Sequence, residues 1–262
     1  MGEGTRRVGN MEIKKTVVMD SDFIFGTRTV IEAIKAGRPI DKVLLRNGLS
    51  NDLFDELFML IRDHRIVFQF VPQEKLDRIT WKNHQGVIAL IASVEFHQLA
   101  DILPGIWEKG ETPLLLILDH ITDVRNFGAI IRSAECAGVH AVVVPDKGAA
   151  RVGDDAMKTS AGALHLVPVC RAASLVAECD FLRESGVKII AATEKGNTLY
   201  TRAGMSGPLA IIMGAEDIGI SPALLRKADD LVKIPILGQI GSLNVSVAAS
   251  LMVYEAIRQR NL

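Results

Sequence analysis

The sequence is poor in cysteine and in aromatic residues, and it has no excess of charge of either sign. Its three cysteines show no CxxC spacing and lie in largely apolar stretches, which argues against a disulfide framework and a zinc site. Thirty Lys and Arg residues against 31 Asp and Glu residues give a net charge of -1, so any binding of a polyanion has to depend on local basic patches. No apolar run approaches the roughly 18 residues of a membrane span, and the polar first residues lack the apolar core of a signal peptide. These absences favour a reducing cytoplasm over export or membrane insertion.

The hydrophobic content of 48% over 262 residues is enough for a sizeable core in one or two domains. After a polar arm over residues 1–20, predicted to be flexible, helical and strand patterns alternate through residues 21–95, which predicts a small α/β domain. Residues 96–112 have weaker periodicity and contain proline and glycine, as is typical of a linker. Residues 113–262 form a second predicted unit.

In the small unit, apolar residues at helical spacing predict a first helix that is followed by a glycine. Helices are expected over residues 23–36 and 52–63, and strands over residues 42–46, 67–71 and 86–92. In the second unit, unbroken apolar runs alternate with helical segments, a pattern typical of parallel strands covered on both faces. Strands are expected over residues 114–118, 141–144, 187–192 and 209–213. Helices are expected over residues 127–137, 154–164, 173–185, 222–227 and 245–260.

The first segment with chemical potential, LDHITDVRNFGAIIRSAECAG, runs from the strand ending at residue 118 into a helix. Loops at the carboxyl ends of parallel strands are where open α/β sheets bind ligands. In a purely structural interpretation, Asn126 caps the helix and Arg132 is a solvated charge paired with Glu135. However, Arg132 lies among apolar residues without an acidic residue four positions away, and its planar guanidinium suits a phosphate. For Arg132, a structural role as a solvated charge and a functional role in binding phosphate are therefore about equally well supported.

Two further segments follow later strands. IIMGAEDIGIS passes from an apolar strand into Gly214 and Glu216, where glycine would let a ligand approach the backbone, although for this segment taken alone a simple turn with a solvated Glu216 is the favoured interpretation. IPILGQIGSLNVSVAAS is mostly apolar and leads through Ser242 to Asn244, which is predicted to be the N-cap of the last helix. An N-cap role does not exclude a second role for Asn244.

Together, three such segments in this order resemble the SpoU (TrmH-like) family of RNA 2'-O-ribose methyltransferases, over about residues 114–260. Residues 23–95 are similar to the substrate-binding domain of many of these enzymes, with FGTRTVIEAI and NHQGVIALIA as the clearest matches. The resemblance implies an α/β fold: a SPOUT-type trefoil-knotted methyltransferase domain preceded by a small ribosomal-protein-like α/β domain. The arrangement looks most like the two-domain members that methylate a guanosine ribose in 23S rRNA.

The resemblance implies that the methyl donor is S-adenosylmethionine and that the acceptor is a ribose 2'-hydroxyl of RNA. By the family motifs, Gly214, Ile234 and Leu243 would contribute backbone contacts to this cofactor, with Thr193 nearby. Because the methyl group of the donor is already activated, the tasks left to the protein are positioning and removal of the hydroxyl proton. These enzymes usually work as homodimers, often with both subunits contributing to each site.

The resemblance also implies that Arg132 is the catalytic arginine. A guanidinium stays protonated in proteins, so we expect Arg132 to fix a phosphate and to stabilise developing alkoxide charge, whichever group accepts the proton. Asn126, Glu216, Ser242 and Asn244 would complete the site by holding Arg132 and the ribose through hydrogen bonds.

Three other functions are considered. A tRNA could be the substrate in place of 23S rRNA. A non-catalytic RNA-binding or ribosome-assembly protein could keep the fold, although the presence of both Arg132 and Glu216 argues against that. A doubly wound nucleotide-binding enzyme is disfavoured because no GxGxxG or GxxxxGK[ST] follows the first strand of the second unit.

The histidines have no metal-ligand spacing, and none is assigned to a metal. His120 follows the first strand of the second unit, but its neighbour Asp119 and its loop position suffice to explain it. Asn83, His84 and Gln85 could contact RNA or form a polar turn before a strand, and the turn is the favoured interpretation.

Overall fold

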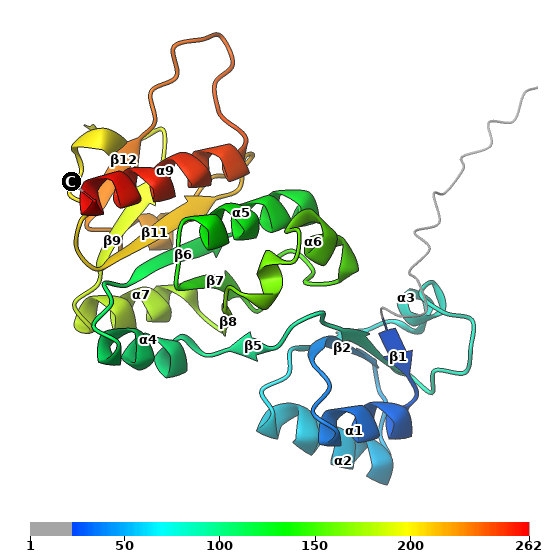
Figure 1. Ribbon diagram of the computed structural model, residues 1–262. Helices are drawn as coiled ribbons and strands as arrows, with labels where there is room; N and C mark the ends of the chain where they lie inside the picture. The colour runs from blue at the N-terminus through cyan, green and yellow to red at the C-terminus, as the bar shows by residue number, and fades with distance from the viewer. Residues whose placement is uncertain (1–22, 262) are drawn as a thin grey trace, which may run out of the picture.

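The computed structural model describes residues 23–261, so the arm predicted over residues 1–20 lies outside the described residues. Figure 1 shows two sheets with helices on both sides. Within the described residues, the first sheet has the strand order β1-β4-β2-β3, and the second has the order β10-β12-β9-β11-β6-β7-β8-β5. We call residues 23–91 the first module and residues 96–261 the second module. The predicted α/β class is confirmed for both.

The first module is a small mixed sheet between helices. Its strands are β1 (Phe23–Phe25), β2 (Ile40–Arg46), β3 (Phe68–Val71) and β4 (Val87–Ile91), and its helices are α1 (Thr27–Lys35), α2 (Asp52–Asp63) and α3 (Gln73–Asp77). Strand β4 pairs antiparallel with β1 and β2, whereas β2 and β3 are parallel. One face of the sheet packs on α1 and α2, and Leu76 of α3 packs on the other face.

The second module is built on an eight-stranded sheet in which every pair of neighbouring strands is parallel. Its strands are β5 (Phe96–His97), β6 (Leu114–Asp119), β7 (Ala141–Pro145), β8 (Val169–Ala172), β9 (Lys188–Ala192), β10 (Thr198–Leu199), β11 (Leu209–Gly214) and β12 (Asp230–Lys233). Its helices are α4 (Leu99–Glu108), α5 (Val124–Cys136), α6 (Asp154–Thr159), α7 (Leu175–Glu184), α8 (Pro222–Leu225) and α9 (Val245–Arg260), with short 3-10 turns at Ala163–His165 and Tyr200–Arg202.

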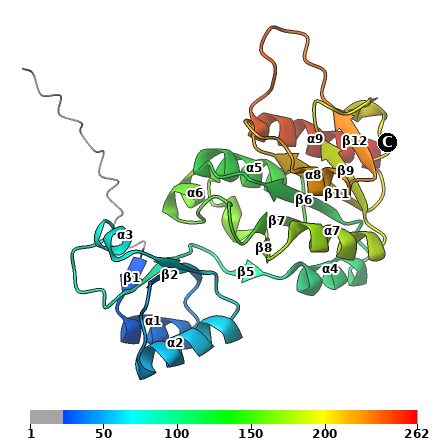
Figure 2. The same ribbon diagram turned by 180° about the vertical axis from the view of Figure 1, so that it is seen from behind.

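Two apolar cores cover the faces of this sheet, as the unbroken apolar runs predicted. Leu114, Leu116 and Leu118 of β6 pack with α5, α6 and α9 on one face. Leu115 and Ile117 of the same strand pack with α4, α7 and α8 on the other face. Alternate side chains of a strand point to opposite faces, so a strand buried on both sides is apolar throughout. Figure 2 shows the layer of α4, α7 and α8 from behind.

Three predicted elements differ most from the structure. The helix predicted over residues 23–36 is wrong at its start, because Phe23–Phe25 pairs with β4 and Gly26, with φ 89°, separates this strand from α1. The helix predicted over residues 154–164 ends at Thr159, because Ala161 and Gly162 adopt the left-handed conformation. The helix predicted to start at residue 127 starts one turn earlier, at Val124.

The segment predicted to be a linker, residues 96–112, contains β5 and α4. Leu99, Leu103 and Ile106 lie one turn apart on α4 and are buried against the sheet, although Pro104 lies inside the helix. Packing of this apolar face outweighs the helix-breaking tendency of the proline. The short strands β8, β10 and β12 were not predicted either.

A contact between the modules is centred on Arg171 of β8. Its guanidinium donates hydrogen bonds to the backbone oxygen and to the carboxylate of Asp41 in β2. The same guanidinium lies 3.6 Å from the ring centroid of Phe96, a cation–π contact. Both charged side chains are largely buried, so the ion pair is well shielded from water.

None of the helices within residues 23–261 is both long and apolar enough to cross a membrane.

Candidate active site

The strands β6, β9, β11 and β12 are close neighbours in the sheet, and a pocket of about 380 Å³ lies past the carboxyl ends of β9, β11 and β12. Thr193 follows β9, Gly214 ends β11 and Ile234 follows β12, while Leu243 precedes α9. All four residues predicted to contact a cofactor line this pocket. Segments far apart in the sequence therefore meet where parallel sheets bind ligands.

Gly214 is required by the chain's own backbone. A Cβ atom at this position would lie 2.3 Å from the carbonyl carbon of Gly219 and 2.4 Å from the backbone nitrogen of Ile220. The turn closes through a hydrogen bond from the Gly219 N–H to the Ala215 oxygen, at 2.8 Å. Glycine at this position was predicted to let a ligand approach the backbone. The structure shows that it also leaves room for the backbone of Gly219 and Ile220.

A polar network lies beside the pocket. Oε1 of Glu216 accepts hydrogen bonds from Asn126 Nδ2 at 3.1 Å, from Asn244 Nδ2 at 2.8 Å and from the Val245 N–H at 3.0 Å. Asn244 Nδ2 also lies 2.9 Å from Asn126 Oδ1. Glu216 lines the pocket as well, so one carboxylate belongs to both the network and the pocket.

The caps of two helices orient these side chains. Oδ1 of Asn244 accepts a hydrogen bond from the Ser246 N–H at 3.0 Å, so its predicted N-cap role in α9 is confirmed. The interpretation of Asn126 as the cap of α5 is wrong. Asp123 caps this helix by accepting hydrogen bonds from the Arg125 and Asn126 N–H groups, at 2.9 and 2.8 Å. The Asn126 amide, in the first turn, thus reaches Glu216 instead.

Asp119 is a structural residue of the site whose anchoring role was not predicted. Its buried carboxylate accepts a hydrogen bond from the Ser221 N–H at 2.7 Å, and its other oxygen lies 2.7 Å from Nδ1 of His120. It thereby connects the end of β6 to the start of α8. The sequence feature that could have indicated this role is the position of Asp119 at the end of the otherwise apolar strand β6. The contact agrees with the expectation that the neighbouring Asp119, and not a metal ion, explains the position of His120.

The remaining two predicted residues lie apart from the network. Ser242 is exposed and lines the pocket. Arg132 is exposed on α5 and does not line the pocket, and its side chain makes no hydrogen bond or ion pair with another residue in the described part of the chain. The next residue on the same helix, Ser133, accepts a hydrogen bond from Ser250 of α9 at 2.8 Å. Arg132 is therefore next in the chain to a residue that contacts α9, and it lies outside the pocket of its own chain.

Pocket residues that the sequence analysis missed include Lys195, Asp217, Ile218 and Ile236. They adjoin predicted residues in the loops after β9, β11 and β12. Only the folded loops could identify them, since nothing in their local spacing distinguishes them from ordinary loop residues.

Within residues 23–261, no three His, Cys, Asp or Glu side chains gather in an arrangement that could hold a metal ion. Burial raises the pKa of Cys170 to about 12 and that of Cys179 to about 11. Both thiols therefore stay protonated at neutral pH and behave as small core residues.

Comparisons with known proteins agree with this geometry. Residues 113–254 match the model of the SpoU rRNA methylase family, and residues 23–97 match that of the RNA 2'-O ribose methyltransferase substrate-binding domain. A Staphylococcus aureus protein named as a TrmH family tRNA/rRNA methyltransferase is 38% identical over 93% of this chain and 98% of its own length. YacO of Bacillus subtilis, with the same family name, is 33% identical over 92% of this chain and 96% of its own length.

Among solved structures, the chain is similar to the SpoU methyltransferase AviRb from Streptomyces viridochromogenes, which was crystallised in complex with AdoMet. The two are 26% identical with a TM-score of 0.58, over 91% of this chain and 90% of AviRb. The trefoil knot implied by the resemblance stays a prediction. The methylase match spans more than half of the chain and the relatives match along nearly their whole length, so the chain belongs to the SpoU family of RNA 2'-O-ribose methyltransferases.

Proposed function

We propose that this protein transfers a methyl group from S-adenosylmethionine to the 2'-hydroxyl of a guanosine ribose in 23S rRNA. The observation that carries the proposal is the position of Glu216, which lines the pocket and also binds Asn126 and Asn244. A pocket for a small molecule that shares a carboxylate with a polar network can hold a methyl donor beside a ribose. Membership of the SpoU family supports RNA as the acceptor.

The pocket fits S-adenosylmethionine in size and in the chemistry of its walls. Its volume of about 380 Å³ lies within the range of roughly 300 to 1,000 Å³ that is usual for small-molecule sites. Ile218, Ile234 and Leu243 offer apolar contacts for the adenine ring, and the carboxylates of Glu194 and Asp217 offer acceptors for the ammonium group. When bound, the cofactor supplies a methyl group that its sulfonium already activates.

The side chains of the network would act on the RNA. The amides of Asn126 and Asn244 and the hydroxyl of Ser242 can donate and accept hydrogen bonds with ribose hydroxyls. The guanidinium of Arg132 would bind an adjacent phosphate and stabilise negative charge that develops on the 2'-oxygen. Positioning of this kind can lower the barrier by about 7 to 11 kcal/mol in favourable cases.

A second copy of the chain would complete the site. Val247, Leu251 and Tyr254 form a stripe along α9 with 48%, 37% and 50% of their areas exposed. Residues three and four positions apart share one helix face, and an apolar face of this kind favours a protein partner. Because α5 and α9 lie side by side on the sheet (Figure 1), a copy that covers α9 also comes near Arg132. The Arg132 side chain of one subunit would then serve the pocket of the other.

We expect Leu251→Glu to convert the dimer into monomers and to lower methyl transfer by about 10-fold or more, since an interface charge would be buried without a partner. Light scattering gives the mass, and a radiolabelled methyl assay gives the activity. Met59→Glu on α2 of the first module, where Met59 is 61% exposed, is the matched control and should remain dimeric and active. A wild-type protein that is monomeric and fully active would contradict the shared site.

The substrate is tested with RNA from a strain that lacks the gene. Purified 23S rRNA and tRNA are incubated separately with the protein and S-adenosylmethionine, and 2'-O-methylguanosine is quantified by mass spectrometry. We expect new 2'-O-methylguanosine in 23S rRNA alone, an RNA that the protein would meet in the cytoplasm. Methylation of tRNA alone would favour the second candidate, which the tRNA/rRNA names of the relatives keep open. Binding of RNA without methylation of either would favour the non-catalytic alternative.

A further inference from the structure

The loop between α3 and β4 carries a tryptophan that points into solvent. Trp81 is 87% exposed, which makes it the most exposed aromatic side chain of the part of the chain that the structure describes. A tryptophan buries a large area when it finds a partner, and full exposure of the indole is therefore unfavourable in the free protein. The loop, residues 78–86, is consequently a candidate contact surface.

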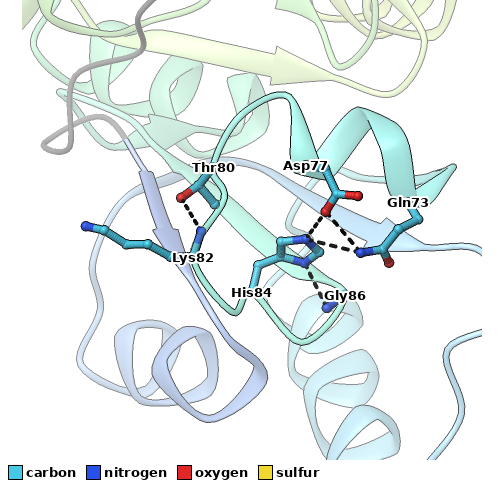
Figure 3. Close-up of polar contacts among 6 residues, drawn as sticks. All are labelled: Gln73, Asp77, Thr80, Lys82, His84 and Gly86. Carbon is cyan, nitrogen blue, oxygen red and sulfur yellow. Dashed lines mark hydrogen bonds and ion pairs between the residues drawn. The ribbon is translucent and has the colours of Figure 1, made fainter.

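This loop is held in one conformation by a buried histidine. As Figure 3 shows, Nδ1 of His84 accepts a hydrogen bond from the Gly86 N–H at 3.0 Å, and its Nε2 lies 2.9 Å from Oδ1 of Asp77. Because Nδ1 accepts, Nε2 carries the proton and donates to the carboxylate. The ring thus ties the end of α3 to the residue before β4. Near the middle of the loop, the Lys82 N–H donates to Oγ1 of Thr80 at 3.3 Å.

Gln85 fixes the other side of the loop. Its Oε1 accepts a hydrogen bond at 3.2 Å from the N–H of Thr27, the first residue of α1. Gln85 and Gly86 are both left-handed, with φ of 55° and 82°. A non-glycine residue in this conformation is strained and persists only when its surroundings hold it there. His84 and Gln85 thus form the predicted polar turn, which follows Trp81 in the same loop.

Cationic residues from two segments, the loop itself and the end of β2, lie at this turn. Arg78 and Lys82 flank Trp81 in the sequence, and Arg78 is exposed. Arg46 ends β2, where its N–H donates to the Gly86 oxygen at 2.8 Å. Asp77, the nearest carboxylate in the sequence, is engaged by His84. For a chain with a net charge of -1, this is a local basic patch of the kind that a polyanion needs.

We propose that Trp81 is a stacking platform for an unpaired base of the RNA substrate, with Arg46 and Arg78 facing the flanking phosphates. The proposal rests on the RNA-directed function above. Every base has a π-face, and stacking on an aromatic side chain contributes about 1 to 3 kcal/mol per base. Within a paired helix the base faces are covered, so this loop selects unpaired nucleotides. The cationic residues of the loop and of the end of β2 favour this occupant over an apolar protein surface.

The chain offers a clean optical test, because it has two tryptophans. Trp107→Phe leaves Trp81 as the single indole reporter. We expect an RNA hairpin with a long unpaired loop to quench its emission, while the fully paired duplex of the same sequence leaves it nearly unchanged. Trp81→Ala should raise the Kd for the hairpin by about 5- to 150-fold, which corresponds to 1 to 3 kcal/mol, and Trp81→Phe should keep most of the affinity.

Trp107→Ala is the matched control, since Trp107 lies on α4 of the second module with 42% of its area exposed, and we expect an unchanged Kd. An unchanged Kd for Trp81→Ala, or equal quenching by duplex and hairpin, would overturn the proposal. So would loss of self-association in Trp81→Ala with RNA affinity intact, which would make the loop a protein contact. Failure of the proposed methyl-transfer function can be distinguished from failure of the Trp81 proposal. It would appear as no methyl transfer by the wild-type protein, whether or not hairpin RNA quenches Trp81.

Discussion

Replacing Arg132 by lysine is expected to reduce methyl transfer by about 100-fold or more while the cofactor still binds. Lysine keeps the positive charge but loses the planar pair of donors that binds a phosphate and a developing oxyanion together. Cofactor affinity should be unchanged, because the proposed partners of Arg132 are an RNA phosphate and the 2'-oxygen, and Arg132 does not line the pocket of its own chain. Mass spectrometry of 2'-O-methylguanosine measures the first quantity, and titration calorimetry measures the second.

The control for this substitution is Arg183→Lys. Arg183 is an exposed arginine on α7, and its Nε lies 3.5 Å from a carboxylate oxygen of Asp229 in a weak ion pair. It should retain wild-type activity. Methylation by Arg132→Lys at the wild-type rate would exclude a role of the guanidinium in the reaction.

Mixed dimers locate Arg132 relative to the pocket that it serves. Arg132→Ala and Glu216→Ala proteins should each be inactive alone. When they are unfolded and refolded together, a mixed dimer restores one complete site if Arg132 acts across the interface. No recovery would indicate that Arg132 and Glu216 work within one chain.

Gly214→Ala is expected to cause the largest loss of stability, about 3 kcal/mol or more in the free energy of unfolding. The added Cβ would lie within 2.5 Å of three backbone atoms of Gly219 and Ile220, and backbone cannot rotate away as a side chain does. Urea unfolding followed by circular dichroism measures the change. Gly207→Ala is the control, because nothing lies within 4 Å of its Cβ position, and it should change stability by no more than about 0.5 kcal/mol. Equal stability of the two variants would mean that the backbone of the turn after β11 can shift to accommodate the added methyl group at little cost.

The sequence predicted the elements that are long or buried on both faces. Helix α9 has the predicted bounds, and β11 differs by one residue, because their apolar patterns are continuous. Strands β8 and β12 have four residues each, too few for a periodicity to stand out. Helix α4 escaped prediction because Pro104 and Gly105 suggest a loop locally, whereas burial against the sheet decides the outcome.

The site was predictable where a motif fixes it. The motif residues Gly214, Ile234 and Leu243 reach one pocket together with Thr193. The N-cap of α5 was not predicted correctly, since an error of one turn in the start of the helix shifts the cap from Asp123 to Asn126. The position of Arg132 relative to a pocket could not be predicted at all, because it depends on how two copies of the chain would associate.

The buried ion pair between Arg171 and Asp41 has a consequence for substrate choice. It joins β8 of the second module to β2 of the first, and Phe96 packs on the same guanidinium. With the modules held in this way, the distance from Trp81 to the proposed methyl-transfer pocket is fixed. If Trp81 stacks on a base as proposed, an RNA would be selected by the spacing between its unpaired base and its target ribose as well as by its sequence.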